Sequence, residues 1–192
     1  MAYYFKSVDS PIGRLKLVAT EHKLAAVLWE VDRPNRVRPG ELLPAQANPA
    51  IDAAEQQLVE YFAGQREHFE LVLEFQGTEF QKKVWAALLT IPFGETRTYS
   101  EIARQIGHPT AVRAVGAANG RNPIAIIAPC HRVIGASGAL TGFAGGLAAK
   151  HLLLRIERGE DPALPGGALE RVPNERTRWA ASPSVQGRLF ED

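Results

Sequence analysis

The sequence predicts an α+β fold, with an antiparallel sheet first and a helical region after it. Three apolar and β-branched runs lie near the N-terminus, at residues 3–8, 15–20 and 24–31. Helix-capping residues follow from Asn48 onward, and two of the helices flank a short turn that contains glycine. Strands followed by a run of helices are typical of α+β proteins, and 192 residues suffice for one ordinary domain or two small ones.

Residues 1–77 are expected to form an α+β scaffold domain. Turns at residues 11–13 and 21–23 connect the three strands into an antiparallel meander. A proline-rich loop follows over residues 33–44, and a further short strand is predicted over residues 71–75.

One helix is expected within this scaffold. Asn48 is a capping residue, Pro49 suits the first helical turn, and Gly64 marks the end. No residue cluster in this part of the chain indicates chemistry.

Residues 78–159 are predicted to form a second, helical domain. Its first helix ends at Pro92 and buries one face, made of Phe80, Val84, Trp85, Leu88 and Leu89. Thr98 and Glu101 form a capping box, in which each side chain can bond the other residue's backbone amide. The helix that this box opens is expected to run to about Ile106.

A second short helix, over residues 110–119, follows a tight turn at Gly107, His108 and Pro109. Two short helices around such a turn are typical of a helix-turn-helix. The second helix is rich in small residues and has Arg113 as its long cation; the small residues are Ala111, Ala114, Gly116, Ala117 and Ala118. Its backbone can therefore approach another surface closely, and tight helix packing is the alternative explanation.

Cys130 is the only cysteine of the chain, within Pro129-Cys130-His131-Arg132-Val133. A lone cysteine cannot close an internal disulfide or build a thiolate zinc site. It is therefore an inert core residue, a redox thiol or a nucleophile. His131 adjoins it in sequence, although activation requires a base in spatial contact with the thiol.

The chain ends with a glycine-rich loop, a helix and a tail. Glycines punctuate residues 135–146, the last helix is predicted over residues 147–158, and Gly159 stops it. Residues 160–192 are rich in proline, glycine and charge without periodicity, which predicts a mobile tail.

Composition favours a soluble, cytoplasmic protein. A single cysteine suits a reducing compartment, the first ten residues lack the pattern of a signal peptide, and no apolar run has membrane-spanning length. We expect no contact with a membrane.

Charge is distributed unevenly along the chain. Residues 96–155 contain seven cations and one anion, a net charge of +6, so the rest carries −5 of the total +1. A positive half beside a negative half fits a nucleic-acid face on one domain, and a solvated helix that collects arginines is the alternative.

Several motifs resemble, in order and spacing, the O6-alkylguanine-DNA alkyltransferases. The matching residues are Thr98-Tyr99, Arg113-Ala114-Val115-Gly116, Asn122-Pro123, Pro129-Cys130-His131-Arg132-Val133, Gly145-Gly146 and Glu157. The resemblance implies a ribonuclease H-like N-terminal domain and a winged helix-turn-helix-like second domain. It also implies suicide repair, in which the protein flips O6-alkylguanine out of duplex DNA and keeps the alkyl group on Cys130.

The resemblance also implies catalytic roles. His131 accepts the thiol proton through a bridging water, Glu157 orients and charges the imidazole, and Tyr99 offers its hydroxyl to the departing purine. Taken singly, Glu157 would be a solvated helix-end residue and His131 a surface imidazole.

DNA contact and pocket shape follow from the same resemblance. Arg113 enters the base stack, and its helix, with Ala111, Ala114 and Gly116, docks in the minor groove with little base reading. Asn122 is a hinge, while Val133, Phe143 and Ala144 belong to the pocket and its surroundings. Phe143 and Ala144 replace the tyrosine and serine of some relatives. No metal or other cofactor is expected, and the protein should act as a monomer on double-stranded DNA.

Three alternative functions account for part of the sequence. An alkyltransferase-like module binds the lesion without a nucleophile, a thiol hydrolase or redox enzyme turns over, and a plain winged-helix transcription factor needs no thiol.

The tail holds one further motif, in Gln186-Gly187-Arg188-Leu189-Phe190. It resembles the short peptides by which bacterial repair proteins dock on the sliding clamp. Leu189 and Phe190 would be the apolar anchors and Gln186 the orienting amide, and a chance match is the alternative.

Overall fold

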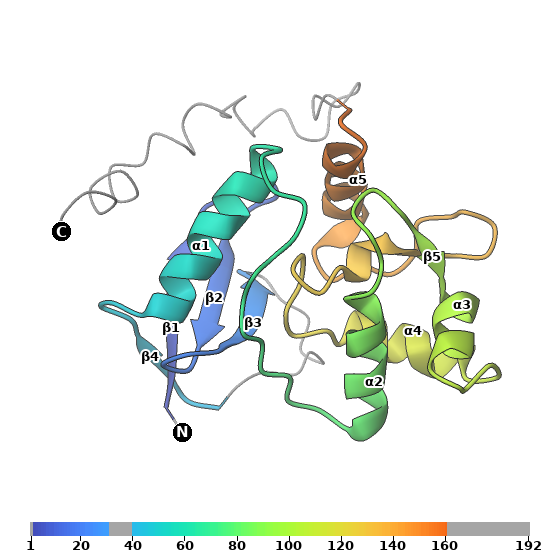
Figure 1. The fold of residues 1–192 in the computed structure, drawn as a ribbon, viewed down its shortest axis with the longest axis horizontal. Helices are drawn as coiled ribbons and strands as arrows, with labels where there is room; N and C mark the ends of the chain where they lie inside the picture. The colour runs from blue at the N-terminus through green and yellow to red at the C-terminus, as the bar shows by residue number, and fades with distance from the viewer. Residues whose placement is uncertain (1, 31–39, 161–192) are drawn as a thin grey trace.

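Two groups of elements lie side by side in the computed structural model, which describes residues 2–30 and 40–160 (Figure 1). A sheet covered by one helix forms the first group, and four shorter helices form most of the second. A single cluster of buried apolar residues extends through both groups. The α+β fold class is confirmed, whereas the domain boundaries at residues 77 and 159 stay a proposal. The predicted tail lies outside the described residues.

The N-terminal sheet has the strand order β3, β2, β1, β4. As predicted, β1 (Tyr3–Val8), β2 (Leu15–Ala19) and β3 (Leu24–Trp29) form an antiparallel meander. A fourth strand, β4 (Leu42–Pro44), pairs with β1 in the parallel direction. The loop predicted over residues 33–44 therefore extends too far, because its last three residues form β4. A strand of three residues is too short to show an alternating pattern in the sequence.

The strand predicted over residues 71–75 is wrong. Its pairing is an isolated bridge between Leu73 and Leu24, flanked by hydrogen bonds of Leu24 with Val72 and Glu74. The segment follows the edge of β3 for one residue and then leaves it, so its β-propensity is not matched by a partner of sufficient length.

Helix α1 (Pro49–Phe62) begins where it was expected. The Asn48 side chain accepts a hydrogen bond from the Ile51 amide at 3.0 Å and donates one to the Thr20 carbonyl at 2.9 Å. The Asn48 side chain thus caps the first turn of α1 and also ties the helix to the sheet. The buried face of α1 packs on the sheet and includes Ile51, Ala54, Leu58, Tyr61 and Phe62.

Helix α2 (Glu79–Leu88) begins at a capping box formed by Thr78 and Gln81. It ends at Leu88, before Pro92, because a turn already closes on the carbonyls of Ala87 and Leu88. Leu89 therefore lies past the helix and is 46% exposed, so its predicted place in the core is wrong.

The helix-turn-helix consists of α3 (Tyr99–Gln105) and α4 (Val112–Gly120). Thr98 and Glu101 make the predicted capping box, with the Glu101 amide donating to the Thr98 hydroxyl at 3.2 Å. Gly107 has a φ of +76° in the turn, a conformation that glycine adopts without steric cost.

Two short strands and the last helix complete the second group. β5 (Arg97–Thr98) pairs in parallel with β6 (Val133–Ile134), and α5 (Gly146–Glu157) follows. Gly159 has a φ of +68° just past α5, which confirms the predicted stop. Among the described helices, none is both long and apolar enough to cross a membrane.

Candidate active site

Two tight turns bring Cys130 to the start of the 3₁₀ turn η1 (Cys130–Arg132). The Ile127 amide donates to the Ala125 carbonyl at 2.8 Å, and the Cys130 amide donates to the Ala128 carbonyl at 2.7 Å. The first turn places Ile126 at a φ of +71°, which is strained for a β-branched residue. Cys130 itself is only 4% exposed.

Two asparagines hold this strained segment. Asn122 donates to the Ala128 carbonyl at 2.8 Å and accepts from the Ile124 amide at 3.0 Å. Asn119, in the last turn of α4, donates to the Cys130 carbonyl at 3.4 Å. Asn122 thus braces the turns from within, and Asn119 bonds the helix-turn-helix to the Cys130 carbonyl.

His131 and Glu157 form a buried pair. The distance between His131 Nε2 and Glu157 Oε1 is 2.6 Å, and both side chains are 0% exposed. η1 supplies the histidine and the last turn of α5 supplies the glutamate. The structure therefore joins two side chains that, taken singly, would have been expected in solvent.

Three other groups bind the same carboxylate. Arg132 donates from Nε to Oε2 at 2.8 Å and from Nη2 to Oε1 at 3.0 Å. Tyr61 donates its hydroxyl to Oε1 at 2.7 Å, and the Gly94 amide donates to Oε2 at 3.3 Å. With His131, these donors occupy the lone pairs that a carboxylate offers.

The charge state of the pair follows from these contacts. Burial alone would raise the pKa of Glu157, but the bonds and charges of His131 and Arg132 lower it to about 2. Burial lowers the pKa of His131, against the opposing effect of Glu157, and Arg132 and Lys150 lower it further. At neutral pH the site therefore holds a carboxylate and a neutral imidazole.

This charge state fixes the tautomer of His131. An ionised carboxylate only accepts hydrogen bonds, so the Nε2 atom that faces Glu157 carries the hydrogen. Nδ1 is then the acceptor, and it is buried without a hydrogen-bond partner among the described residues. His131 thus has an unused lone pair next to Cys130 in sequence.

Lys150 is a second buried cation. Its ammonium donates to the carbonyls of Val133 at 2.5 Å and Thr141 at 2.9 Å. Burial lowers the pKa of Lys150, and the negative charge of an ionised Cys130 acts against this shift. Lys150 therefore fixes the loop after Cys130, and its charge would attract an ionised thiol there.

Tyr99 reaches the same loop from the helix-turn-helix. Its hydroxyl lies 3.4 Å from the Thr141 carbonyl, which also accepts from Lys150. A Cβ on Gly116 would lie 3.8 Å from the Tyr99 ring, an ordinary van der Waals contact, so an alanine at this position would also fit beside the ring. Thr141 thus links Tyr99 to the surroundings of Cys130.

Phe143 packs between the site and the N-terminal sheet. Its ring lies edge-on to Trp29 at 5.7 Å and to His131 at 6.4 Å. A side chain at Gly145 would collide with Trp29, with a Cβ distance of 2.5 Å. Ala144 is half-buried between these two residues.

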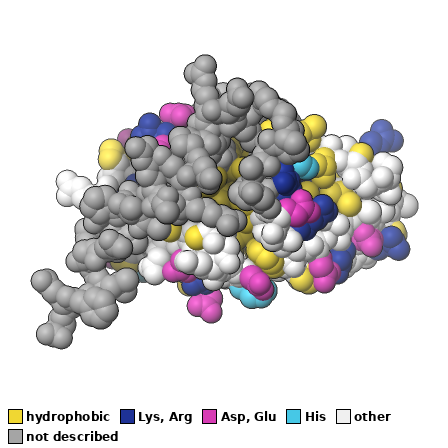
Figure 2. All heavy atoms as spheres, turned by 90° about the horizontal axis from the view of Figure 1, so that it is seen from above, with side chains coloured by type: hydrophobic (Ala, Val, Ile, Leu, Met, Phe, Trp, Pro, Cys, Tyr) yellow, Lys and Arg dark blue, Asp and Glu magenta, His cyan; other side chains and the backbone are white. Residues whose placement is uncertain are grey.

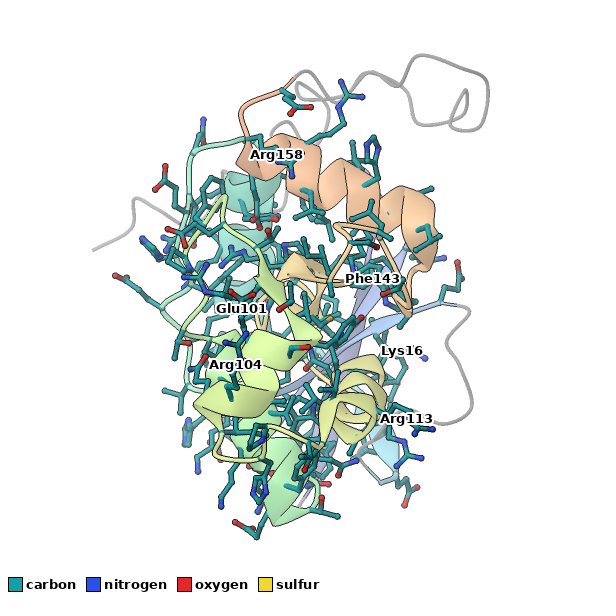
Figure 3. The ribbon with its side chains drawn as sticks, turned by 90° about the vertical axis from the view of Figure 1, so that its right-hand side faces the viewer. Lys16, Glu101, Arg104, Arg113, Phe143 and Arg158 are labelled. Atoms are coloured by element: carbon teal, nitrogen blue, oxygen red, sulfur yellow. The ribbon has the colours of Figure 1, made fainter. Side chains whose placement is uncertain are left out.

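The face of α4 that points away from the protein is made of small residues and one cation. Arg113, Ala114 and Ala117 are exposed, Ala111 and Gly116 are half-buried, and Val115 and Ala118 face the core. Figure 3 shows Arg113 on the outer side of α4, with Arg104 on the neighbouring α3. Of the α4 residues predicted to contact DNA, Arg113 and Ala114 are accessible and Gly116 is half-buried, whereas the Cys130 thiol is buried.

The excess of positive charge in residues 96–155 is partly internal. Arg132 and Lys150 are buried, and Arg132 pairs with Glu157 just beyond this stretch. On the part of the surface that Figure 2 shows outside the grey atoms, basic and acidic side chains are interspersed. The cations left for an outside partner are therefore fewer than the sequence count indicates.

Four site residues were missed from sequence: Tyr61, Asn119, Arg132 and Lys150. Lys150, Leu153 and Glu157 share one face of α5. Ionisable residues at both ends of an otherwise apolar face could have indicated that Lys150 and Glu157 have buried partners. Tyr61 belongs to the apolar face of α1 and gives no such signal. No group of three or more His, Cys, Asp or Glu side chains in the described residues could hold a metal ion.

A buried thiol, a histidine–glutamate pair and an accessible helix-turn-helix define a DNA-binding protein with a cysteine nucleophile. Family models for 6-O-methylguanine DNA methyltransferase match both parts of the chain. The ribonuclease-like domain matches residues 3–75, and the DNA-binding domain matches residues 79–159. The chain therefore belongs to the 6-O-methylguanine DNA methyltransferase family.

Relatives and solved structures agree with this membership. The methylated-DNA–protein-cysteine methyltransferase of Mycolicibacterium paratuberculosis is 51% identical to this chain, over 83% of this chain and 94% of the relative. The enzyme of the same name from Mycobacterium leprae is 54% identical, over 80% of this chain and 91% of the relative. The crystal structure of Mycobacterium tuberculosis OGT in complex with DNA matches with a TM-score of 0.74 and 47% identity, over 84% of this chain and 97% of that chain. The chain is thus a DNA-binding repair protein that transfers an alkyl group from DNA to a cysteine, and Cys130 is its only cysteine.

Proposed function

We propose that alkyl transfer runs through a proton path from Cys130 to His131. A free thiol has a pKa of about 8.5 and is only a few per cent ionised at neutral pH. A water molecule between the sulfur and His131 Nδ1 would carry the proton to the unused lone pair. The observation that carries the proposal is the buried, unpartnered Nδ1 of a ring whose other nitrogen, Nε2, binds the charged Glu157.

The transfer step is a displacement at the alkyl carbon. The sulfur–carbon bond forms as the bond from that carbon to guanine O6 breaks, and the thioether is permanent. The thiol proton goes to His131, and the departing purine is stabilised by the Tyr99 hydroxyl. Lys150 and the contact of Thr141 with Tyr99 support this arrangement.

The base reaches the thiol by leaving the duplex. Because Cys130 is buried, an O6-alkylguanine stacked in DNA cannot meet it without extrusion. Arg113 is placed on the exposed face of α4, where it can fill the gap in the stack, and the small residues around it allow close approach to the minor groove.

His131→Gln tests the proton path. If His131 is the base, transfer at pH 7 should slow at least about tenfold, and the loss should shrink as the pH rises through about 8.5, where the thiol ionises without help. Single-turnover rates with O6-methylguanine duplex would show this. A loss of equal size at every pH would contradict the role as a base.

Two further proposals concern the whole protein. The reaction needs a reduced thiol, which supports a cytoplasmic location. We also propose that the protein acts as a monomer, because one chain holds the complete set of reacting groups. Analytical ultracentrifugation with lesion DNA tests this, and a dimer as the reactive species would contradict it.

The clamp motif of Gln186, Leu189 and Phe190 lies outside the described residues. We keep the sliding clamp as a proposed partner, because Leu189 and Phe190 provide paired apolar anchors and Gln186 an orienting amide. Pull-down of a bacterial clamp by the full chain, compared with a Leu189→Ala, Phe190→Ala variant, tests it. Equal capture, or none by either protein, would end the proposal.

A further inference from the structure

The N-terminal part of the chain reaches the active site through Tyr61. Its hydroxyl donates to Glu157 Oε1 at 2.7 Å, although 96 residues separate the two in sequence. Both residues are buried, Tyr61 completely. Because Tyr61 lies in the last turn of α1 and Glu157 in the last turn of α5, the bond joins two helices from the two halves of the protein (Figure 1).

Tyr61 shares one oxygen with His131. Oε1 of Glu157 accepts from the Tyr61 hydroxyl at 2.7 Å, from His131 Nε2 at 2.6 Å and from Arg132 Nη2 at 3.0 Å. Each donor withdraws negative charge from that oxygen, so the donors compete for it. The strength of the bond to His131 therefore depends on the Tyr61 hydroxyl.

Aromatic packing holds the Tyr61 ring independently of this bond. The ring lies edge-on to Phe62 at 5.4 Å and to Phe93 at 6.2 Å, and it is tilted against Phe69 at 5.4 Å. The Arg132 guanidinium lies 5.8 Å from the centre of the Phe93 ring. A phenylalanine in place of Tyr61 would keep these contacts and lose only the hydroxyl.

We propose that Tyr61 is a positioning residue for alkyl transfer: its hydroxyl holds the Glu157 carboxylate and limits how strongly that carboxylate binds His131. The inference rests on the proposed role of His131 as the base. It assigns to the N-terminal half a part in the reaction, where the sequence indicated a scaffold alone.

The direction of the effect follows from the groups that face His131. From η1 these are Cys130 and Arg132, and from α5 they are Lys150 and Glu157; Tyr61 acts from α1 through Glu157. Glu157 favours the protonated imidazole, and the two cations oppose it. Loss of the Tyr61 hydroxyl leaves more negative charge on Oε1, so His131 should hold a proton more tightly.

The test compares Tyr61→Phe with Tyr3→Phe in the full chain. Tyr3 is a matched control, because it is also a buried tyrosine whose hydroxyl donates to a carboxylate, that of Glu74, at 2.8 Å in the N-terminal part. Two readouts are needed: the protonation midpoint of the His131 ring by ¹⁵N NMR, and the pH profile of single-turnover transfer from O6-methylguanine duplex.

We expect Tyr61→Phe to raise the His131 midpoint by on the order of half a pH unit, and Tyr3→Phe to leave it unchanged. The acid limb of the transfer rate should move upward with the midpoint. An unmoved midpoint in Tyr61→Phe, or equal shifts in both variants, would overturn the inference. A midpoint that moves while the rate profile stays fixed would support the positioning of Glu157 and instead refute His131 as the base.

Discussion

His131 Nε2 and Glu157 Oε1 lie 2.6 Å apart, with both side chains shielded from solvent. In most buried pairs each charge compensates the other, but here Arg132 already compensates Glu157 with two hydrogen bonds. Burial lowers the pKa of His131, and the charge of Arg132 lowers it further, so the imidazole is neutral and its second nitrogen can accept a proton. The predictions below follow from this division of roles.

Glu157→Gln should destabilise the protein as well as slow transfer. The substitution keeps the shape of the side chain but leaves the buried Arg132 guanidinium without a counter-charge, at a cost of about 3–5 kcal/mol. Denaturant unfolding measures this loss. Glu160→Gln is the control, because Glu160 is half-exposed and pairs with Arg155 at 3.3 Å, so about 0.5 kcal/mol or less is expected there. Equal losses in the two variants would contradict the account.

Stability should decrease with acidification in two stages. Because the pKa of His131 is lowered in the folded protein, the imidazole of the unfolded chain is protonated at a higher pH than that of the folded chain. Stability therefore falls as the pH drops below about 6.5, the ordinary histidine value. The pKa of Glu157 is lowered to about 2, so its contribution is complete above its ordinary value of 4.5 and is lost as the pH falls toward 2. The free energy of unfolding against pH tests both stages. His131→Gln should remove the first stage and also reduce the second, because His131 contributes to the lowered pKa of Glu157. A profile in His131→Gln that matches the unsubstituted protein below pH 6.5 would count against a neutral His131 in the folded state.

Much of the fold was predictable because its signals are local. Asn48, Thr78 and Thr98 cap helices within a few residues of their own positions, and the antiparallel strands are joined by short turns. β4 and the segment around Leu73 were mispredicted, because their pairing depends on distant partners and involves few residues.

The site divides in the same way. Cys130 and His131 are adjacent in a motif that resembles the alkyltransferases, and the same resemblance indicates Glu157. The roles of Tyr61 and Lys150 depend on where whole helices pack, since each bonds a group that is remote in sequence. The apolar face of α1 gives no sign that the Tyr61 hydroxyl has a buried partner.

Arg113→Ala should separate flipping from chemistry. Repair of O6-methylguanine in duplex DNA should fall markedly, because the gap in the base stack loses its filler, which contributes part of the few kcal/mol that extrusion costs. Reaction with the free base O6-benzylguanine should change far less, since no stack is opened. Arg121→Ala, which removes an exposed cation just past α4, should affect duplex repair less than Arg113→Ala does. An equal loss on duplex and free base would indicate a folding defect and refute the role.

Lys150→Met should slow transfer through two effects. The carbonyls of Val133 and Thr141 lose their shared donor, which should cost about 1–3 kcal/mol of stability, and a Cys130 thiolate loses a nearby cation. Reaction of the folded protein with iodoacetamide at a fixed neutral pH reports on the thiolate and should become slower. Lys82→Met removes a lysine that pairs with Glu79 on the surface and should change neither property. An unchanged iodoacetamide rate in Lys150→Met would show that Lys150 only fixes the loop.

The stoichiometry of transfer tests the central claim most directly. Protein incubated with an excess of O6-methylguanine duplex should gain the mass of one methyl group, located on Cys130 by peptide mapping, and one guanine should be repaired per molecule. Cys130→Ala should still bind the DNA, because the exposed face of α4 does not include the thiol, but it should gain no methyl group. Repair of more than one guanine per protein molecule, or a methyl group on another residue, would contradict irreversible transfer to Cys130.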